Sequence, residues 1–209
     1  MRKSIVVGSA LLATLTVAGI ALMAQQDKSS RPSPPAKAEC KLSNGKTVTI
    51  DYSSPRAKGR KVFGGLVPYG QIWRAGANEA TTFVTSGDIS VGGKAVPAGK
   101  YTIFTVPGED KWALAISKKT GEWGTAYPGP DNDLARIDMK VSKTSAPVEN
   151  FTIAFDQSGN GCTLRMEWET PAPQSTSSSR WPIVRLAVHS WEVSVILRAS
   201  DEDARRTST

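Results

Sequence analysis

The residues best suited to chemistry gather in the stretch 52–82, where five cations are accompanied by a single acid, Glu79. Guanidinium groups bind carboxylate or phosphate through paired hydrogen bonds, and the faces of tyrosine and tryptophan can stack on a ring or sugar. We therefore predict a site for a small anionic or carbohydrate ligand. Its candidate residues are Arg56, Arg60, Tyr69, Trp73, Arg74, Asn78 and Glu79.

The same stretch has a structural interpretation. It can be a long ordered loop across one end of a sheet, with Arg74 and Glu79 as an internal ion pair and Trp73 in the core. Against this, loops of such length in compact domains often carry function. The backbone N–H groups of residues 75–77 could add a small anion-binding nest. Binding is the interpretation we favour.

A hydrolase is a different hypothesis for the acids. Glu79 with Asp131 or Asp133 could supply a general acid and a general base, as in glycosidases, if the carboxyl groups lie about 5–9.5 Å apart. We rank this enzyme below a binding module and below a structural or protein-interaction domain.

Metal and cofactor motifs are weak. Asp131, Asp133 and Asp138 lie near Asn132 and Tyr127, but the spacing of a calcium-binding EF-hand is missing. The chain has one histidine, His189, and two cysteines, too few for a zinc cluster. The glycines form no phosphate-binding motif. We predict no metal and no cofactor.

Short strands must position these residues. The 209 residues are 39% hydrophobic and include 18 Gly and 13 Pro, which favours many short elements over a helix bundle. Alternating patterns between residues 40 and 170 predict an all-β domain, an antiparallel β-sandwich of eight or nine strands, with a small closed barrel as the second choice. The expected strands are 47–52, 81–85, 88–91, 94–96, 101–106, 111–117, 136–141, 148–155 and 162–168.

The N-terminus looks like an export signal. Arg2 and Lys3 precede residues 4–24, which carry no charge. This segment is either a cleaved signal peptide ending at Ala24 or an uncleaved membrane anchor helix, so residues 1–24 predict export to the periplasm or beyond. Residues 25–39 contain three Pro and three Ser and are expected to be a flexible linker.

Export changes the meaning of Cys40 and Cys162. In an oxidising compartment the two form a disulfide candidate that would close a loop of more than 100 residues. The alternative is two unpaired thiols. Nucleic acid is not an expected partner, because the compartment is wrong and residues 40–170 carry a net charge of only +3.

The last 39 residues differ in kind. Residues 171–209 contain no Gly and five Arg but no Lys, and they begin with a Pro- and Ser-rich run. We interpret them as a poorly ordered tail that does not belong to the fold, for instance through a shifted reading frame. The alternative is a tail with its own interaction role. His189 lies there, so no chemistry is assigned to it.

Several motifs in combination resemble a family of exported bacterial proteins, the domain of unknown function numbered 2911. The motifs are G-R-x-x-F-G from Gly59, V-P-Y-G-x-x-W-R-x-G-A-N-E-A-T from Val67 and P-A-G-x-Y from Pro97. The resemblance covers about residues 40–170. It implies a β-rich envelope or secreted domain and supplies no catalytic residues. Members of this kind are similar in continuing with another apolar strand after the final Trp, whereas here Trp168 is soon followed by Pro-Ala-Pro.

Overall fold

The computed structural model describes residues 28–169 and 191–199, and its contacts divide the chain after Arg31. In the first unit, Lys28–Ser30 forms one turn of 3-10 helix, η1. All that follows concerns the second unit. The expected signal or anchor segment, residues 1–24, lies outside the described residues. Within the described ranges, we find no helix of the length and apolarity needed to cross a membrane.

The second unit is built on one sheet of eleven strands in which every pair is antiparallel. Its spatial order is β1-β2-β3-β6-β7-β8-β11-β10-β9, and β4 joins β11 to β5. This confirms the all-β antiparallel prediction. The strands are β1 (Pro35–Lys41), β2 (Thr47–Ser53), β3 (Thr82–Thr85), β4 (Ile89–Val91), β5 (Lys94–Val96), β6 (Gly99–Val106), β7 (Lys111–Ser117), β8 (Asp133–Lys143), β9 (Val148–Ser158), β10 (Gly161–Glu169) and β11 (Trp191–Ala199), with a short 3-10 helix η2 (Pro130–Asn132) before β8.

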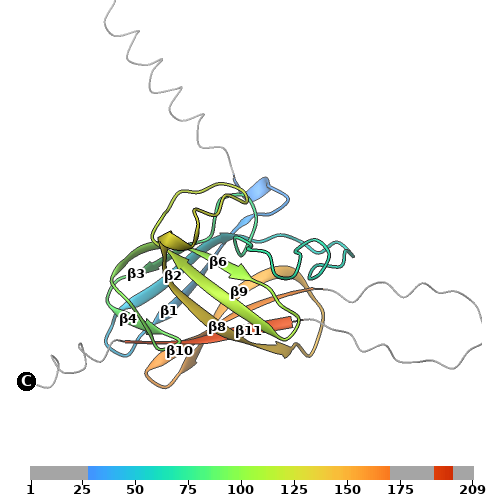
Figure 1. Cartoon of the computed structure of the whole chain (residues 1–209). Helices are drawn as coiled ribbons and strands as arrows, with labels where there is room; N and C mark the ends of the chain where they lie inside the picture. The colour runs from blue at the N-terminus through green and yellow to red at the C-terminus, as the bar shows by residue number, and fades with distance from the viewer. Residues whose placement is uncertain (1–27, 170–190, 200–209) are drawn as a thin grey trace, which may run out of the picture. The chain divides into compact units, whose positions relative to one another are not determined.

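The predicted sandwich is wrong, because a single sheet curls into a nearly closed barrel, our second choice (Figure 1). The two end strands of the order, β1 and β9, approach each other. Beyond β2 the chain even bonds to β9: Phe151 N–H donates to the Pro55 carbonyl over 2.9 Å. Alternation of polar and apolar residues predicts one buried face, which a sandwich and a barrel share. The sequence pattern therefore could not separate them.

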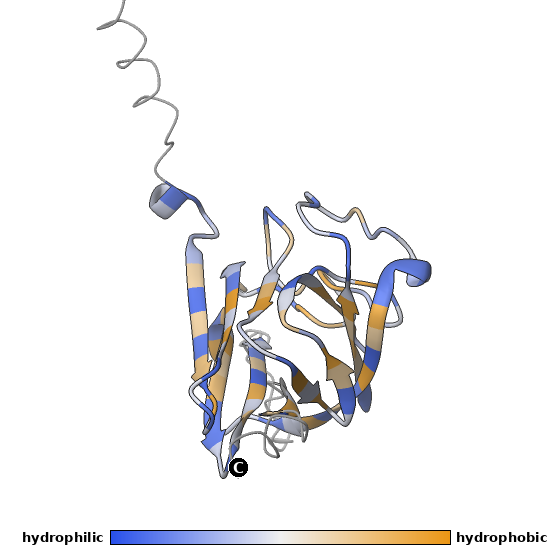
Figure 2. Ribbon diagram, turned by 90° about the vertical axis from the view of Figure 1, so that its left-hand side faces the viewer, coloured by the Kyte–Doolittle hydropathy of each residue, from blue (hydrophilic) through white to orange (hydrophobic). Residues whose placement is uncertain are grey.

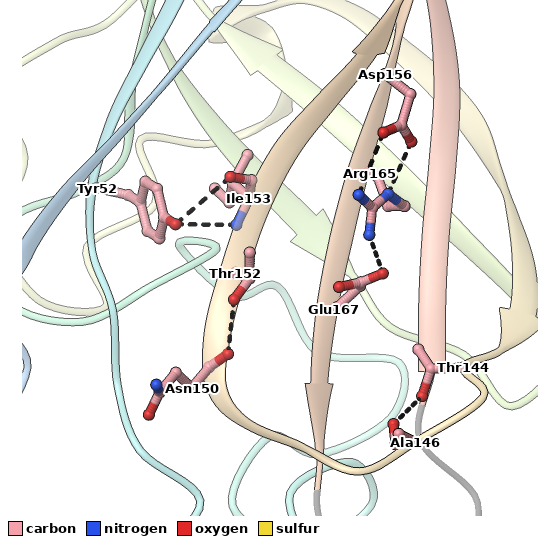
Figure 3. Close-up of polar contacts among 9 residues, drawn as sticks. All are labelled: Tyr52, Thr144, Ala146, Asn150, Thr152, Ile153, Asp156, Arg165 and Glu167. Atoms are coloured by element: carbon pink, nitrogen blue, oxygen red, sulfur yellow. Dashed lines mark hydrogen bonds and ion pairs between the residues drawn. The ribbon is translucent and has the colours of Figure 1, made fainter.

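The seam between β1 and β9 is closed by side chains. The Tyr52 hydroxyl accepts a hydrogen bond from Ile153 N–H over 3.0 Å and donates one to the Ile153 carbonyl (Figure 3). Cys40 on β1 and Cys162 on β10 form a disulfide whose Cα atoms are 6.4 Å apart, at the other end of the seam from Pro55. This is the cysteine pair that the sequence singled out.

The core fills the inside of the barrel. Along β2 the buried side chains Val48, Ile50 and Tyr52 alternate with more exposed ones, and hydrophobic bands recur along the other strands (Figure 2). Each buried aliphatic or aromatic side chain contributes about 1.5–3 kcal/mol to the hydrophobic driving force. The largest fully buried side chains are Trp168, Phe83, Phe104, Phe151, Ile50, Ile89, Ile103, Leu114, Ile116, Met139, Leu164 and Met166.

Both expected boundaries of the domain move outward. β1 begins at Pro35, inside the expected linker 25–39, because Ala36, Ala38 and Cys40 already alternate toward the core. The alternation was missed in the sequence because it is made mainly by alanines, and strands are usually recognised by larger apolar residues.

The interpretation of residues 171–209 as a tail outside the fold is corrected for residues 191–199. They form β11, which pairs with β8 on one side and β10 on the other. Val195 and Leu197 are buried. The lack of glycine and the change from Lys to Arg misled the prediction, because neither property opposes a strand. Residues 170–190, with His189, and 200–209 lie outside the described residues.

Candidate functional site

The barrel-end segment, residues 54–81, crosses the end of the barrel opposite the disulfide (Figure 1). It is attached to the strand ends there. Gly70 N–H donates to the Pro107 carbonyl over 2.8 Å, and Trp73 and Thr105 exchange two backbone hydrogen bonds of 2.7 Å. The turns in the segment use Gly64 and Gly70, which have φ angles of +75° and +73° that disfavour larger residues.

A cluster of aromatic side chains packs the barrel-end segment against the core. The rings of Trp73 and Trp168 stack with centroids 5.8 Å apart and an interplanar angle of 16°. Phe151 lies edge-on to Trp73 at 4.9 Å, and Phe63 lies edge-on to Trp112 at 4.7 Å. Such pairs each add about 0.5–1.5 kcal/mol beyond buried area. Trp73 is therefore a packed residue, as the structural interpretation expected, with its ring held in a fixed orientation.

A cavity of about 360 Å³ lies between this segment and the barrel. Its lining combines apolar residues, among them Leu66 and the stacked Trp73 and Trp168, with the cations Arg60 and Arg74. Of the described residues, no Asp, Glu, His or Cys lines it. The lining residues are Ser33, Pro55, Arg60, Leu66, Val67, Pro68, Gln71, Ile72, Trp73, Arg74, Gly76, Ala77, Thr125 and Trp168.

Arg74 is the distinctive group of this cavity. Its Nε atom is buried and has no hydrogen-bond partner among the described residues. Burial lowers the pKa of the Arg74 guanidinium. A buried donor without a partner is costly, and a ligand anion would offset that cost.

A second recess of about 410 Å³ adjoins the cavity. It is lined by Pro32, Ser33, Pro55, Arg56, Lys58 and Arg60. Arg56 donates through Nη1 to the Ser54 carbonyl and hydroxyl, and Arg60 donates to two backbone carbonyls. These bonds fix both guanidinium groups at the recess.

The other predicted site residues are placed elsewhere. Tyr69 packs on Gly64, where an added Cβ would lie 2.7 Å from the ring. Asn78 donates through Nδ2 to the carbonyl of Ser33, which lines both hollows, so it is a positioning residue. Glu79 forms a backbone bridge with Trp123. None of these three side chains lines the cavity.

The predicted nest at residues 75–77 is partly used by the fold itself. Ala77 N–H donates to the Ser53 carbonyl over 3.1 Å, and the Ala75 carbonyl accepts from Thr81 Oγ1. Gly76 and Ala77 still line the cavity. The Ala77 N–H is therefore committed to the fold, and the arginine side chains are the main donors of the site.

Two of the three aspartates of the weak calcium pattern, Asp133 and Asp138, have separate partners. Asp133 accepts hydrogen bonds from Tyr127 and Arg136, both of 2.7 Å, and Asp138 pairs with Lys111 on the neighbouring strand β7. Nowhere in the described ranges do three potential ligand residues gather in a metal-binding group. These contacts explain the acids as supports of the 127–133 loop and of the sheet.

Sequence reasoning missed Trp168 and Glu169. Trp168 forms a wall of the cavity, and the Glu169 carboxylate accepts hydrogen bonds from the N–H groups of Val62 and Phe63 in the barrel-end segment. Burial nevertheless raises the pKa of Glu169. Both residues lie more than 90 positions from the arginines, so only the barrel topology brings them to the same end. Ser33, Gln71 and Thr125 of the lining were missed too, with no chemical signal to mark them.

Comparison with known proteins gives one match. Residues 33–174 match the family model described as "Protein of unknown function (DUF2911)". Neither the curated proteins nor the solved structures contain a match to the chain. The family match ends before β11, although that strand lies between two strands of the matched region.

Proposed function

Because the chain belongs to the DUF2911 family, whose description names no activity, we propose its function from geometry: it is a non-catalytic binding module for a small carboxylate-bearing ligand. The ligand lies in the cavity between the barrel-end segment and the barrel. Its carboxylate meets Arg74, and its body lies against Trp73 and Trp168.

The buried Nε of Arg74 is the observation that carries this proposal. An arginine that served only the fold would be expected to have its buried donor matched by the protein itself. Here the lining residues offer no carboxylate for that match. A carboxylate in the cavity would form a charge-assisted, two-pronged hydrogen bond with the guanidinium. Aromatic walls and a few placed polar groups are also usual features of small-molecule sites.

A sugar acid fits the same site. The partly exposed indole of Trp73 offers an apolar surface to a pyranose ring, and Gln71 and Thr125 offer polar groups to hydroxyls. This keeps uronic acids among the ligands to be tested.

We place the module in the cell envelope. Residues 4–24 support export by their uncharged apolar run behind Arg2 and Lys3. The Cys40–Cys162 disulfide supports an oxidising compartment. Cleavage of residues 1–24 would decide whether the module is attached to the membrane. It would not change the residues that line the cavity.

A protein-interaction role is the second candidate, and one observation favours it. Trp123 is 61% exposed, which is unusual for a large aromatic side chain. It lies two residues from Thr125 of the cavity lining. If a partner protein docks there, Trp123→Ala abolishes that capture and leaves carboxylate binding intact.

The test is a thermal-shift screen of the purified exported portion, residues 25–209. The probes are benzoate, galacturonate, glutarate and inorganic phosphate, with chloride at equal ionic strength as the reference. We expect at least one carboxylate to raise the melting temperature of the wild-type protein and not that of Arg74→Met.

The matched control is Arg198→Met, which removes the same charge from β11 at a different recess and should respond like the wild type. The proposal is wrong if no anion stabilises the wild-type protein while Arg74→Met alone lowers its melting temperature strongly. That pattern would make Arg74 a structural residue.

A further inference from the structure

The cavity and the second recess adjoin each other at one end of the barrel. Ser33, Pro55 and Arg60 line both. A ligand that reaches from one part into the other passes Arg60. The cavity holds the aromatic wall and Arg74, and the recess holds Arg56 and Lys58.

The charge of the combined hollow exceeds what one carboxylate can balance. Four cations line it: Arg56, Lys58, Arg60 and Arg74. Among the residues described, no Asp or Glu lines either part. The carboxylate of Glu149 accepts a hydrogen bond from Lys58 N–H over 2.8 Å, but Glu149 does not line the recess. Cations this close repel one another unless anions lie between them.

The two arginines of the recess are already oriented. Arg60 Nε donates to the Ala57 carbonyl over 2.9 Å, and its Nη2 donates to the Arg56 carbonyl over 2.7 Å. A guanidinium carries further N–H donors beyond those bonds. Donors that the fold holds in place lose little conformational entropy when they bind an anion.

From this arrangement we propose that the ligand carries two anionic groups separated by an apolar or ring-shaped spacer. One group binds Arg74, the other binds Arg56, Lys58 and Arg60, and the spacer lies against Trp73 and Trp168. This inference rests on the proposed carboxylate site and extends it to a substrate class, the diacids. A carboxylate and a phosphate share the chemistry required of the second group.

The test is isothermal titration calorimetry with a chain-length series. Straight-chain dicarboxylates from malonate to azelate are compared with monocarboxylates of the same length, and with phosphonocarboxylates that carry a phosphonate as the second group. We expect one chain length of diacid to bind about five- to tenfold more tightly than its monocarboxylate, as a partly exposed second ion pair would give.

Lys58→Met isolates the second group. Lys58 is exposed, its side chain is not needed for the loop hydrogen bond that its backbone makes, and Met matches its length at the φ of +50°. The variant should weaken the best diacid about threefold and leave monocarboxylates unchanged. Lys37→Met on the exposed side of β1 removes the same charge outside the hollow and should change neither.

The outcomes separate the two proposals. If diacids and monocarboxylates bind equally and Lys58→Met affects neither, the diacid inference is overturned while the carboxylate site stands. If no probe binds, both are overturned. Arg74→Lys keeps the positive charge but loses the planar guanidinium that binds a carboxylate through two hydrogen bonds. It should lower the affinity for both diacids and monocarboxylates, and it serves as a second variant in case Arg74→Met does not fold.

Discussion

Two arginines of this barrel stand in opposite environments. Arg165, on β10, is held between Asp156 on β9 and Glu167 on its own strand (Figure 3). Its hydrogen bond to Asp156 has the largest effect on the pKa of Arg165, which it raises, and the hydrogen bond to Glu167 raises it further, although partial burial acts in the opposite direction. Arg74, at the barrel end, has a buried Nε without a partner among the described residues, and burial lowers its pKa.

The difference in environment indicates different roles for the two arginines. Arg165 supports the fold, and Arg74 is the group to which we assign ligand binding. In the barrel wall, Arg165 and Lys111 each pair with an acid on a neighbouring strand, Asp156 and Asp138. At the barrel end, Arg60 and Arg74 line the cavity beside Trp73, and none of the described acids lines it. Disturbing the wall should therefore change stability, and disturbing the end should change binding.

Ending the chain at residue 190 should break the wall and produce the largest effect. β11 would be lost from between β8 and β10, exposing two strand edges and the core beneath Val195 and Leu197. We expect loss of the cooperative thermal transition, measured by circular dichroism. A chain ending after Ala199 is the control. If the chain without β11 melted at the same temperature as the chain that ends after Ala199, residues 171–209 would lie outside the fold, as the sequence analysis expected.

Removing the disulfide should be the next largest effect. Cys40 and Cys162 are 122 residues apart in sequence, so the chain-entropy relation gives about 4–5 kcal/mol for the double alanine variant. Denaturant unfolding measures it. Because the disulfide lies at the opposite end from the cavity, benzoate affinity well below the melting temperature should stay at the wild-type value. A parallel loss of affinity would show that the two ends are coupled.

Arg74→Met should separate binding from stability. Removing one partner of a buried charge pair costs about 2–5 kcal/mol of binding, roughly 30-fold or more in affinity. The unfolding free energy should not fall, because the variant removes a buried donor that none of the described residues matches. Calorimetric titration and denaturant unfolding on the same sample check both. A large loss of stability would place Arg74 with Arg165 as a support.

Arg165→Met should give the reverse pattern at a smaller scale. Asp156 is 56% exposed and Glu167 is 17% exposed, so solvent screens much of the interaction. We expect a loss of about 1 kcal/mol in unfolding free energy and no change in ligand affinity. An effect on affinity would mean that wall and end do not act separately.

The smallest effect concerns pH. Burial raises the pKa of Glu169, so the folded protein holds its proton more tightly than the unfolded chain, whose pKa is about 4.3. Stability should therefore fall as pH rises from about 4.3 through the raised value. Glu169→Gln should flatten that slope in a series of melting curves. An unchanged slope would show that Glu169 is not its cause.

The strands were accessible from sequence because their signals are local. The predicted strands 101–106 and 111–117 are confirmed as β6 and β7, which pair with each other on either side of a Pro-Gly turn. Barrel closure was not accessible, since it depends on β1 meeting β9 across more than 100 residues. β11 was missed because it follows a long stretch of unusual composition.

The candidate site was predictable in its charges and not in its geometry. The density of Arg residues and Trp73 pointed to the barrel end at which the candidate cavity lies, and Arg60, Trp73 and Arg74 line that cavity. Tyr69, Asn78 and Glu79 were grouped with them by proximity in sequence alone. Trp168 could not be found, because a residue at the end of a distant strand joins the site only through the register of β9 and β10.

The most direct test of the central claim observes both arginines in one spectrum. A proton–nitrogen correlation spectrum of the arginine Nε–H groups is recorded during a titration with benzoate, with Arg74→Met and Arg165→Met providing the assignments. The account predicts that the Arg74 signal moves downfield and saturates, while the Arg165 signal, already bonded to Asp156, stays in place. An Arg74 signal that lies downfield from the start, or that does not move at saturating benzoate, would contradict it.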